Sequence, residues 1–336
     1  MIHPIDRARA VERFEAIPRL ALGHYPTPIE KLPRFREALG GGPRLWMKRD
    51  DYTGPGCGGS KVRKLEYVLA AAQAEGADAV ITCGGVRSNH CRITAMMAAK
   101  LGLECVLVQN QPVQPYPHTP ASLAIEEMVG ARIVPVYDRA ERAPTMERIA
   151  EELRGEGRHP VIIPLGASAP LGALGLVSAA SELAAQLAAR ELRIDAIFFS
   201  SSSGGTHAGL AAGKELFLNP GTQLIGVSPD DPSESIAGVV REIFHGVAAR
   251  LGVEMNAEIE VLDEYIGDGY GIESEAGREA LGMLARTEGI LLDPVYTAKA
   301  MAALMDWIRG GKLSKDANVL FWHTGGQMAL FMRDNQ

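Results

Sequence analysis

A lysine lies beside two glycines and two further cations in the segment GGSKVRKLE, residues 58–66. Lys61 follows the Gly-Gly pair, and Arg63 and Lys64 come directly after it at the expected start of a helix. Acidic residues usually occupy that position, because the N-terminal end of a helix carries a partial positive charge. This charge and the two neighbouring cations lower the affinity of the Lys61 amine for its proton. The segment therefore indicates either a reactive amine or a solvated basic helix face.

A run of small polar residues could bind a phosphate group. The segment SSSSGGTHAG (200–209) follows an apolar strand and enters a helix. Ser203, Gly204, Gly205 and Thr206 would expose backbone N–H groups and hydroxyls at the positive helix end. The run lacks the lysine of a P-loop and the spacing of a dinucleotide fingerprint, which disfavours a nucleoside triphosphate. A tight turn that binds nothing is the alternative.

The lysine and the phosphate cradle together favour pyridoxal phosphate, held by Lys61 as a Schiff base. Two more motifs of small or polar residues follow apolar strands, CGGVRSNH (83–90) and HTGG (323–326). Ligands of open parallel sheets bind where strands end and helices begin. We therefore expect these motifs to form one composite pocket.

The elements that must position these motifs alternate between strands and helices. The expected strands are 77–83, 103–109, 131–137, 159–165, 194–200, 223–228 and 318–323. The expected helices are 63–75, 89–101, 120–130, 143–156, 172–191, 206–217, 233–251, 273–288 and 297–309. This alternation predicts an α/β fold of two doubly wound open-sheet domains. We assign residues 1–62 and 169–336 to a large cofactor-binding domain and residues 63–168 to a small domain. The proline-rich stretch 109–120 is expected to be a lid or a plain surface loop.

Composition limits the possible partners. The formal net charge is −7, from 34 basic and 41 acidic residues, which disfavours nucleic-acid and membrane-surface binding. The four cysteines form no CxxC pair, so we expect reduced thiols, no metal site and a cytoplasmic location. The N-terminal segment is charged and has a helical pattern without an apolar signal core, and no run of about 18 apolar residues is evident.

Six motifs in order resemble one family of enzymes. They are GGSKVRKLE, GGVRSNHCR, SSSGGTHAGL, YGIESEAG, LLDPVYTAKAM and HTGGQMAL. The chain resembles the pyridoxal-phosphate enzymes of the D-cysteine desulfhydrase and 1-aminocyclopropane-1-carboxylate deaminase family, which have the tryptophan synthase β-like fold. The likeness runs from YPTPIEKLPRF (25–35) to HTGG. It implies a homodimer and a small amino-acid substrate.

The resemblance implies roles for the matching positions. Lys61 would be the Schiff-base lysine, and Asn89 would donate to the phenolic oxygen of the cofactor. Ser88 and adjacent N–H groups would hold the substrate carboxylate, although Ser88 and Asn89 could simply cap the following helix. The phosphate would be bound by Ser203, Gly204, Gly205 and Thr206.

Two tyrosines and three further positions bear on the reaction. Tyr270 and Tyr296 would flank the substrate, and Thr324 would face the pyridine nitrogen. The deaminase branch has glutamate, leucine and glutamine where this chain has Thr297, Thr324 and His90, so the likeness is to the desulfhydrase branch. A threonine leaves the pyridine nitrogen largely neutral, which suits α,β-elimination because the leaving group carries off the electrons. The expected catalytic residues are Lys61, Ser88, Tyr270 and Tyr296.

Three positions depart from the motifs of the family, and two of them lie in the expected substrate site, so they bear on the substrate and hardly on the fold or the cofactor. Ser60 replaces an asparagine, Arg87 replaces a glutamine, and Gln327-Met328 replaces Ala-Pro. Arg87 either turns outward or offers its guanidinium to a carboxylate or sulfonate. The expected substrate-contacting residues are Arg87, Ser88, Asn89, His90, Tyr270, Tyr296 and Thr297.

The predicted reaction releases a 2-keto acid, ammonia and the leaving group. Elimination from an anionic substrate such as cysteate, deamination of 1-aminocyclopropane-1-carboxylate and β-replacement stay open as alternatives. A binding protein without catalytic activity is a further alternative from another functional class.

Overall fold

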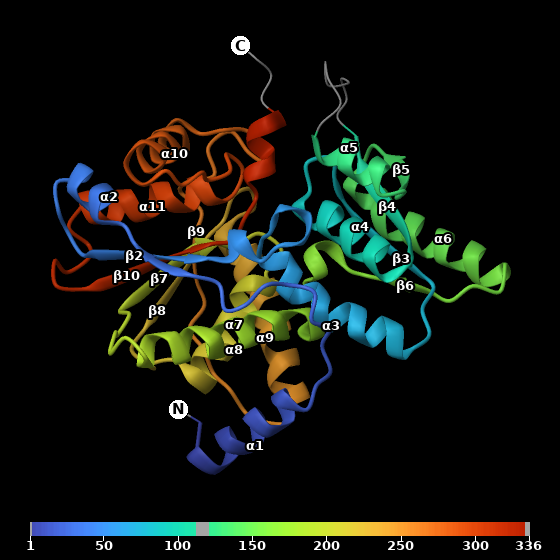
Figure 1. Cartoon of the computed structure of the whole chain (residues 1–336), viewed down its shortest axis with the longest axis horizontal. Helices are drawn as coiled ribbons and strands as arrows, with labels where there is room; N and C mark the ends of the chain where they lie inside the picture. Colours follow the sequence, from blue (N-terminus) through green and yellow to red (C-terminus); the bar gives the residue numbers. More distant parts are fainter. Residues whose placement is uncertain (1, 112–120, 333–336) are drawn as a thin grey trace.

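The computed structural model describes residues 2–111 and 121–332, which form two β-sheets with helices on both faces (Figure 1). Most of the stretch 109–120, expected as a lid or surface loop, lies outside the described residues. The larger sheet has the order β1-β2-β10-β7-β8-β9, and only β1 runs antiparallel to its neighbour. The smaller sheet has the order β5-β4-β3-β6 and is parallel throughout. The α/β class with two open, doubly wound sheets agrees with the prediction.

The strands of the larger sheet come from both ends of the chain. They are β1 (Ile29–Lys31), β2 (Arg44–Arg49), β7 (Ala196–Ser200), β8 (Gln223–Val227), β9 (Glu260–Leu262) and β10 (Asn318–His323). The strands of the smaller sheet are consecutive: β3 (Ala79–Gly85), β4 (Glu104–Asn110), β5 (Arg132–Val136) and β6 (Pro160–Ile162). All seven expected strands are present, and the strands β1, β2 and β9 were not predicted.

Alternating side chains of the larger sheet pack against different helices. Ile197 and Phe199 face a core formed with α1 (Pro4–Glu15), α7 (Pro170–Ala188), α8 (Gly205–Phe217) and α9 (Ser233–Leu251). Phe198 faces the opposite core, which includes α2 (Pro33–Ala38), α10 (Glu275–Glu288) and α11 (Thr297–Arg309). Both faces of the central strands are therefore buried, as expected for parallel strands with crossover helices.

The smaller sheet is covered in the same way. Val80 and Leu107 pack with α3 (Ser60–Ala74) and α4 (Asn89–Leu101), while Ile81 and Val106 pack with α6 (Arg142–Gly155). Helix α5 (Ala121–Met128) packs against α4. Helix α3 also contacts α7 of the larger unit, so it joins the two sheets. The start of α3, where Lys61 lies, is thus held by both units.

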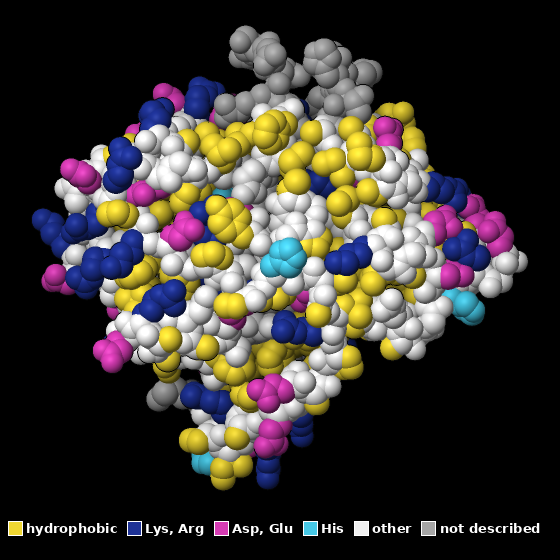
Figure 2. Space-filling model, viewed as in Figure 1, with side chains coloured by type: hydrophobic (Ala, Val, Ile, Leu, Met, Phe, Trp, Pro, Cys, Tyr) yellow, Lys and Arg dark blue, Asp and Glu magenta, His cyan; other side chains and the backbone are white. Residues whose placement is uncertain are grey.

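Helix α7 is long and apolar. By length and composition it is the one helix in the described residues that is long and apolar enough to cross a membrane. Half of its most apolar window is buried, and it packs extensively against α3 and α8. A core helix of a soluble protein passes the same test, so this is weak evidence for a span. Both charge signs are scattered over the face of the molecule shown in Figure 2.

A buried ionic network fixes α3 to the larger sheet. The Arg63 guanidinium donates to both oxygens of Asp50 at 2.8 and 2.9 Å and to Glu182 at 3.0 Å. Lys48 also donates to Glu182, at 2.5 Å, and Trp322 Nε1 donates to Asp50 at 2.8 Å. Arg63 is only 1% exposed. The solvated basic face considered for this segment is therefore wrong.

Candidate active site

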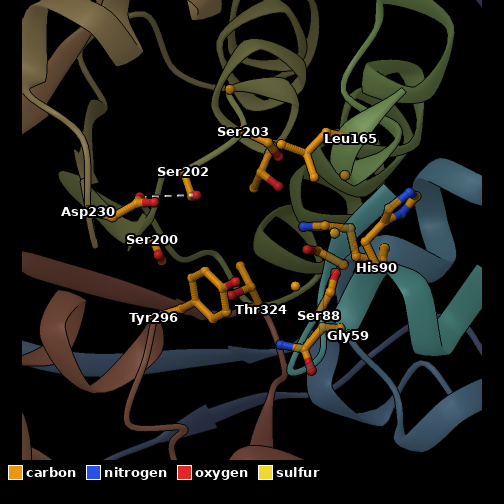
Figure 3. A pocket seen from close by; sticks show the side chains of 18 of the residues that line it. Gly59, Ser88, His90, Leu165, Ser200, Ser202, Ser203, Asp230, Tyr296 and Thr324 are labelled. Atoms are coloured by element: carbon orange, nitrogen blue, oxygen red, sulfur yellow. Dashed lines mark hydrogen bonds between the residues drawn. The ribbon is translucent and has the colours of Figure 1, made fainter. Parts of the chain in front are cut away.

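One pocket lies between the two sheets and brings together most of the residues expected from the sequence (Figure 3). It is lined by Lys61, Ser88, Asn89, His90, Ser203, Gly204, Thr206, Tyr270, Tyr296 and Thr324. Most of these residues follow the carboxyl ends of β3, β7 and β10, where parallel sheets place their ligands. Arg87, Gly205 and Thr297 are not among the lining residues.

The Gly-Gly pair before Lys61 allows two turns to approach closely. Gly59 has a φ of 123°, and a Cβ on it would lie 2.9 Å from the carbonyl oxygen of Thr324. That carbonyl accepts a hydrogen bond from Ser60 N at 3.0 Å. Gly58 is also left-handed, and a Cβ there would lie 1.9 Å from the Asp51 carbonyl oxygen. Glycine is needed at both positions to bring Lys61 beside Thr324.

Lys61 lies on the wall of the pocket with its amine desolvated. Burial lowers the pKa of Lys61 from its ordinary value to about 8. A substantial fraction of the amine is therefore neutral near pH 8, and only the neutral form can act as a nucleophile or base. Lysines with this property are typical of catalytic sites.

The turn between β7 and α8 has the geometry of an anion cradle. Gly204 has a φ of 80°, and the chain enters α8 at Gly205 with the backbone N–H groups of the first turn unpaired within the helix. The Ser203 hydroxyl lies 2.8 Å from the Ser168 hydroxyl, which also accepts from Gly205 N at 3.2 Å. Thr206 is buried and lines the pocket.

Lys64 and the loop before α7 complete the cradle, and the sequence analysis did not assign them there. Lys64 is fully buried, and its amine donates to Ser168 Oγ at 3.3 Å and to the Gly166 carbonyl at 3.4 Å. A Cβ added to Gly205 would lie 2.9 Å from Lys64 Nζ and 2.7 Å from Ser168 Oγ. Burial and the nearby Lys61 hold the pKa of Lys64 well below its ordinary value. An anion in the cradle would stabilise the protonated form of Lys64. The spacing of Lys64 one helical turn after Lys61 was the available signal.

The start of α4 offers donors from the opposite side of the pocket. Ser88 caps the helix, and its hydroxyl accepts from Cys91 N at 3.3 Å. Arg92 donates to Asn89 Oδ1 at 2.7 Å, which orients that amide and leaves its nitrogen free to donate to a ligand. The side chain of His90 is buried between the hydroxyls of Thr82 and Thr94, at 2.7 and 3.4 Å.

The imidazole of His90 is neutral. Burial, followed by the charges of Lys61 and Lys64, holds the pKa of His90 well below its ordinary value. This histidine is therefore a neutral hydrogen-bonding partner of Thr82 and Thr94 and not a charged group.

Two tyrosines form a hydrogen-bonded pair on the larger unit. The hydroxyls of Tyr270 and Tyr296 lie 2.5 Å apart, and their rings meet edge to face. Burial raises the pKa of both phenols, so both are protonated at neutral pH. Such a pair can pass a proton to or from a group in the pocket.

Thr297 lies behind this pair. Its hydroxyl donates to Asp293 Oδ1 at 2.6 Å, and the Asp293 carboxylate accepts the backbone N–H groups of Val295, Tyr296 and Thr297, each at 2.8 Å. Asp293 thereby closes the turn that precedes α11 and fixes the backbone of Tyr296. In the structure Thr297 acts on the turn and has no direct contact with the pocket.

Lys299, which no sequence motif indicated, holds the loops that carry Tyr270 and Asp230. Its fully buried amine donates to the carbonyls of Pro229, Ile266 and Gly269 at 2.9, 2.7 and 2.9 Å. Three carbonyl acceptors satisfy all three ammonium protons. This lysine thus positions two pocket walls without lining the pocket itself.

Two arginines of the smaller unit, Arg139 and Arg142, line the pocket, whereas Arg87 does not. Arg139 lies 3.8 Å from Asp230, which accepts from Ser202 at 3.4 Å (dashed line in Figure 3). No motif singled these arginines out, because they lie in the charged stretch DRAERAP (138–144), which is typical of a surface turn.

The pocket fits the cofactor expected from the sequence. The hydroxyl oxygens of Ser60 and Ser200 are buried and have no partner within the described residues, and both residues line the pocket. Unsatisfied buried polar atoms indicate a ligand that supplies the missing hydrogen bonds. Together with the cradle and the Lys61 amine, they match a ligand with a phosphate and an aldehyde. In the described residues, no group of three His, Cys, Asp or Glu side chains could hold a metal ion, and all four cysteines are free.

Comparisons with known proteins agree with this chemistry. The family described as pyridoxal-phosphate dependent enzyme matches residues 20–325. The chain is 40% identical to D-cysteine desulfhydrase of Salmonella choleraesuis (strain SC-B67) over 317 residues, which cover 94% of this chain and 95% of that protein. It is also 40% identical to D-cysteine desulfhydrase of Salmonella paratyphi C (strain RKS4594), with the same coverage.

Solved structures show the same fold. The crystal structure of an ACC deaminase homologue superposes with a TM-score of 0.85 at 35% identity, covering 98% of this chain and 96% of the other. The crystal structure of a threonine deaminase from T.th. gives a TM-score of 0.66 at 24% identity, with 99% of each chain covered. The second likeness concerns the fold alone.

Proposed function

The chain belongs to the family of pyridoxal-phosphate dependent enzymes, and we propose that it eliminates the β-substituent of a small amino acid. The products are a 2-keto acid, ammonia and the leaving group, as in a D-cysteine desulfhydrase. The observation that carries the proposal is the presence of Lys61, an anion cradle and a protonated tyrosine pair in one pocket. The identity of 40% to D-cysteine desulfhydrases supports it.

The residues that would hold the cofactor lie on three sides of the pocket. Ser203, Gly204, Gly205 and Thr206 would bind its phosphate together with Lys64. Asn89, oriented by Arg92, would donate to its phenolic oxygen. Thr324, at the end of β10, would face its pyridine nitrogen.

The bound cofactor withdraws electrons from the Cα of the amino acid and so acidifies the Cα proton. The neutral amine of Lys61 accepts that proton at Nζ, because burial favours its uncharged form. Ser88 and the N–H groups at the start of α4 hold the substrate carboxylate. The Tyr270–Tyr296 pair donates a proton to the leaving group, since both phenols are protonated at neutral pH.

A cytoplasmic location and a homodimer are parts of the proposal that rest on the family resemblance. Sedimentation velocity of the purified protein tests the second part. A single species at twice the chain mass supports a dimer, and a species at 35.9 kDa contradicts it.

Product analysis tests the reaction. With D-cysteine or β-chloro-D-alanine, pyruvate and ammonia should form in equal amounts, because elimination releases both from one molecule. The L-enantiomers provide the stereochemical comparison.

Added thiol should leave the pyruvate yield unchanged. Formation of a thioether amino acid in place of pyruvate and ammonia would instead show β-replacement. Turnover of 1-aminocyclopropane-1-carboxylate to 2-oxobutyrate should be poor, because Thr297 replaces the glutamate of the deaminase branch and Thr324 offers the pyridine nitrogen only a hydroxyl. Efficient ring opening would contradict the proposed reaction class.

The cradle makes a separate prediction. Gly205→Ala places a methyl group 2.9 Å from Lys64 Nζ and 2.7 Å from Ser168 Oγ, so it should displace donors from the phosphate. Loss of one hydrogen bond to a charged group raises the dissociation constant of the cofactor by about ten- to a hundredfold. At saturating cofactor, kcat should fall far less, because phosphate contacts are equal in the ground and transition states. Titration of the cofactor-free protein with cofactor measures the dissociation constant, and turnover at saturating cofactor measures kcat.

Gly238→Ala is the matched control, because a Cβ there meets no atom within 4 Å. Its cofactor affinity should equal that of the wild type. Equal cofactor affinities for Gly205→Ala and Gly238→Ala would show that the phosphate does not bind in this cradle.

A further inference from the structure

Two cations, Arg139 and Arg142, face the pocket from the smaller unit, at the start of α6. Arg139 belongs to a single helical turn, Arg139–Glu141, and Arg142 is the first residue of α6. Both line the pocket that contains Lys61 and the tyrosine pair. They enter it from the unit that also carries Ser88, whereas the tyrosines belong to the larger unit.

The position of Arg142 is electrostatically unfavourable in the protein alone. The N-terminal end of a helix carries a partial positive charge, and cations there destabilise it. The first turn of α6 has no acidic residue, and Arg142 occupies its first position. The carboxylate of the N-cap residue, Glu141, makes no hydrogen bond to this turn and accepts instead from the backbone N–H groups of Tyr137 and Asp138. A bound anion at this point would be attracted by both the guanidinium and the helix end.

The two arginines differ in what neutralises them. Arg139 is paired with the carboxylate of Asp230 across the pocket at 3.8 Å and lies over the Tyr270 ring at 5.7 Å. Arg142 has a neutral partner: its Nε donates to the Asn110 side-chain oxygen. Within the described residues, no carboxylate pairs with Arg142, and its two terminal nitrogens have no protein acceptor. The uncompensated positive charge of this wall is therefore that of Arg142.

The Asn110 contact gives the guanidinium a fixed orientation. Asn110 is the last residue of β4, a central strand of the smaller sheet, so it is a rigid support. Arg142 is half-buried, and its charge reaches the tyrosine pair, since it acts to lower the pKa of Tyr270 against the larger effect of burial. A planar fork held at one nitrogen presents its remaining donors in the geometry that carboxylates, sulfonates and phosphates accept.

We propose that Arg142 selects amino acids that carry a second acidic group on the β-substituent, with the α-carboxylate bound at the start of α4. Arg139, held by Asp230, contributes a weaker part of the same field. This inference rests on the proposed function, because it places the amino acid at Lys61. It names the substrate class of that site as amino acids with an anionic β-group, such as a sulfonate, phosphate or carboxylate.

A binding experiment on the cofactor-loaded enzyme tests the acidic subsite without turnover. Aspartate carries a β-carboxylate that is not a leaving group, and alanine lacks it. The change in cofactor absorbance gives the dissociation constants of both, measured for each enantiomer. Wild-type enzyme should bind one enantiomer of aspartate about ten- to a hundredfold more tightly than alanine, because one charge-assisted hydrogen bond is gained. Arg142→Gln should remove most of this preference while alanine binding stays nearly constant, and Arg142→Lys should retain part of it.

Arg148→Gln is the matched control, because Arg148 lies on the same helix, pairs with Glu152 on the surface and does not line the pocket. It should keep the full preference for aspartate. Equal affinities for aspartate and alanine in the wild type, or an equal loss for both in Arg142→Gln, would overturn the proposal.

Turnover separates this inference from the proposed function. Cysteate and β-chloroalanine differ in the charge of the β-group, so kcat/KM for cysteate should fall far more than for β-chloroalanine in Arg142→Gln. A preference for aspartate without turnover of cysteate or β-chloroalanine would support the acidic subsite and contradict the proposed elimination. Elimination that favours β-chloroalanine, with no preference for aspartate, would keep the reaction and refute the subsite.

Discussion

Lys61→Ala is expected to lower kcat by at least about a thousandfold, because the covalent link to the cofactor and the acceptor of the Cα proton are lost together. The protein should still bind cofactor through the cradle and should remain folded. Keto-acid production, circular dichroism and cofactor titration measure these three properties. Lys100→Ala provides the control, since Lys100 is an exposed residue in the last turn of α4. Residual turnover within tenfold of the wild type would exclude Lys61 as the base.

The same substitution should not destabilise the cofactor-free protein near neutral pH. The pKa of Lys61 is lowered by burial to about 8 in the folded state, below its value in the unfolded chain. The charged form therefore costs stability below pH 8, on the order of 1–3 kcal/mol, and this cost disappears as the pH rises toward the unfolded pKa. Lys61→Ala removes that cost. Its advantage in Tm over the wild type should be largest at or below pH 8 and should shrink at higher pH.

Asp50→Asn is expected to lower the free energy of unfolding by about 3–5 kcal/mol, because it leaves the buried guanidinium of Arg63 without its main counter-ion. Arg63 is 1% exposed and Asp50 is 0% exposed, so water cannot replace the lost partner. Urea unfolding measures the loss. Asp78→Asn is the control, since Asp78 pairs with Arg158 at the surface and should lose much less. Equal losses in the two variants would show that the network around α3 contributes little.

The pH dependence of this network has a definite sign. Burial alone would raise the pKa of Asp50, but Arg63 and Lys48 outweigh it and hold the pKa below its ordinary value. The contribution to stability is therefore complete above the ordinary pKa of an aspartate and is lost as the pH falls through the lowered pKa. Asp50→Asn should lose most of this acid sensitivity.

Strand–helix alternation made the fold predictable. The central strands β3, β4, β7, β8 and β10 contain continuous apolar runs bounded by small or polar residues, which is typical of buried parallel strands. The edge strands β1 and β9 have three residues each, too few for a pattern of hydrophobic residues to reveal them. Strand β2 was not predicted because both of its ends are charged. The side chains of Arg44, Lys48 and Arg49 pair with partners that are distant in sequence.

The parts of the site that depend on a turn could be predicted, because such turns require particular residues close together in the sequence. Glycines with left-handed backbones and small residues after strands mark the turns around Lys61 and Gly204. Lys299 and Arg142 have no such signature, because their roles come from groups 30 or more residues away or from a pocket formed by both units. A lysine in a helix looks the same in sequence whether it is solvated or fully buried.

Reduction with borohydride followed by peptide mass spectrometry tests the central claim most directly. The account predicts one cofactor adduct per chain, on the side chain of Lys61, and none in Lys61→Ala. Lys64 is the discriminating alternative, since it lies one helical turn away with an amine that burial also makes less basic. An adduct on Lys64, or no adduct on a protein that binds the cofactor, would contradict the account.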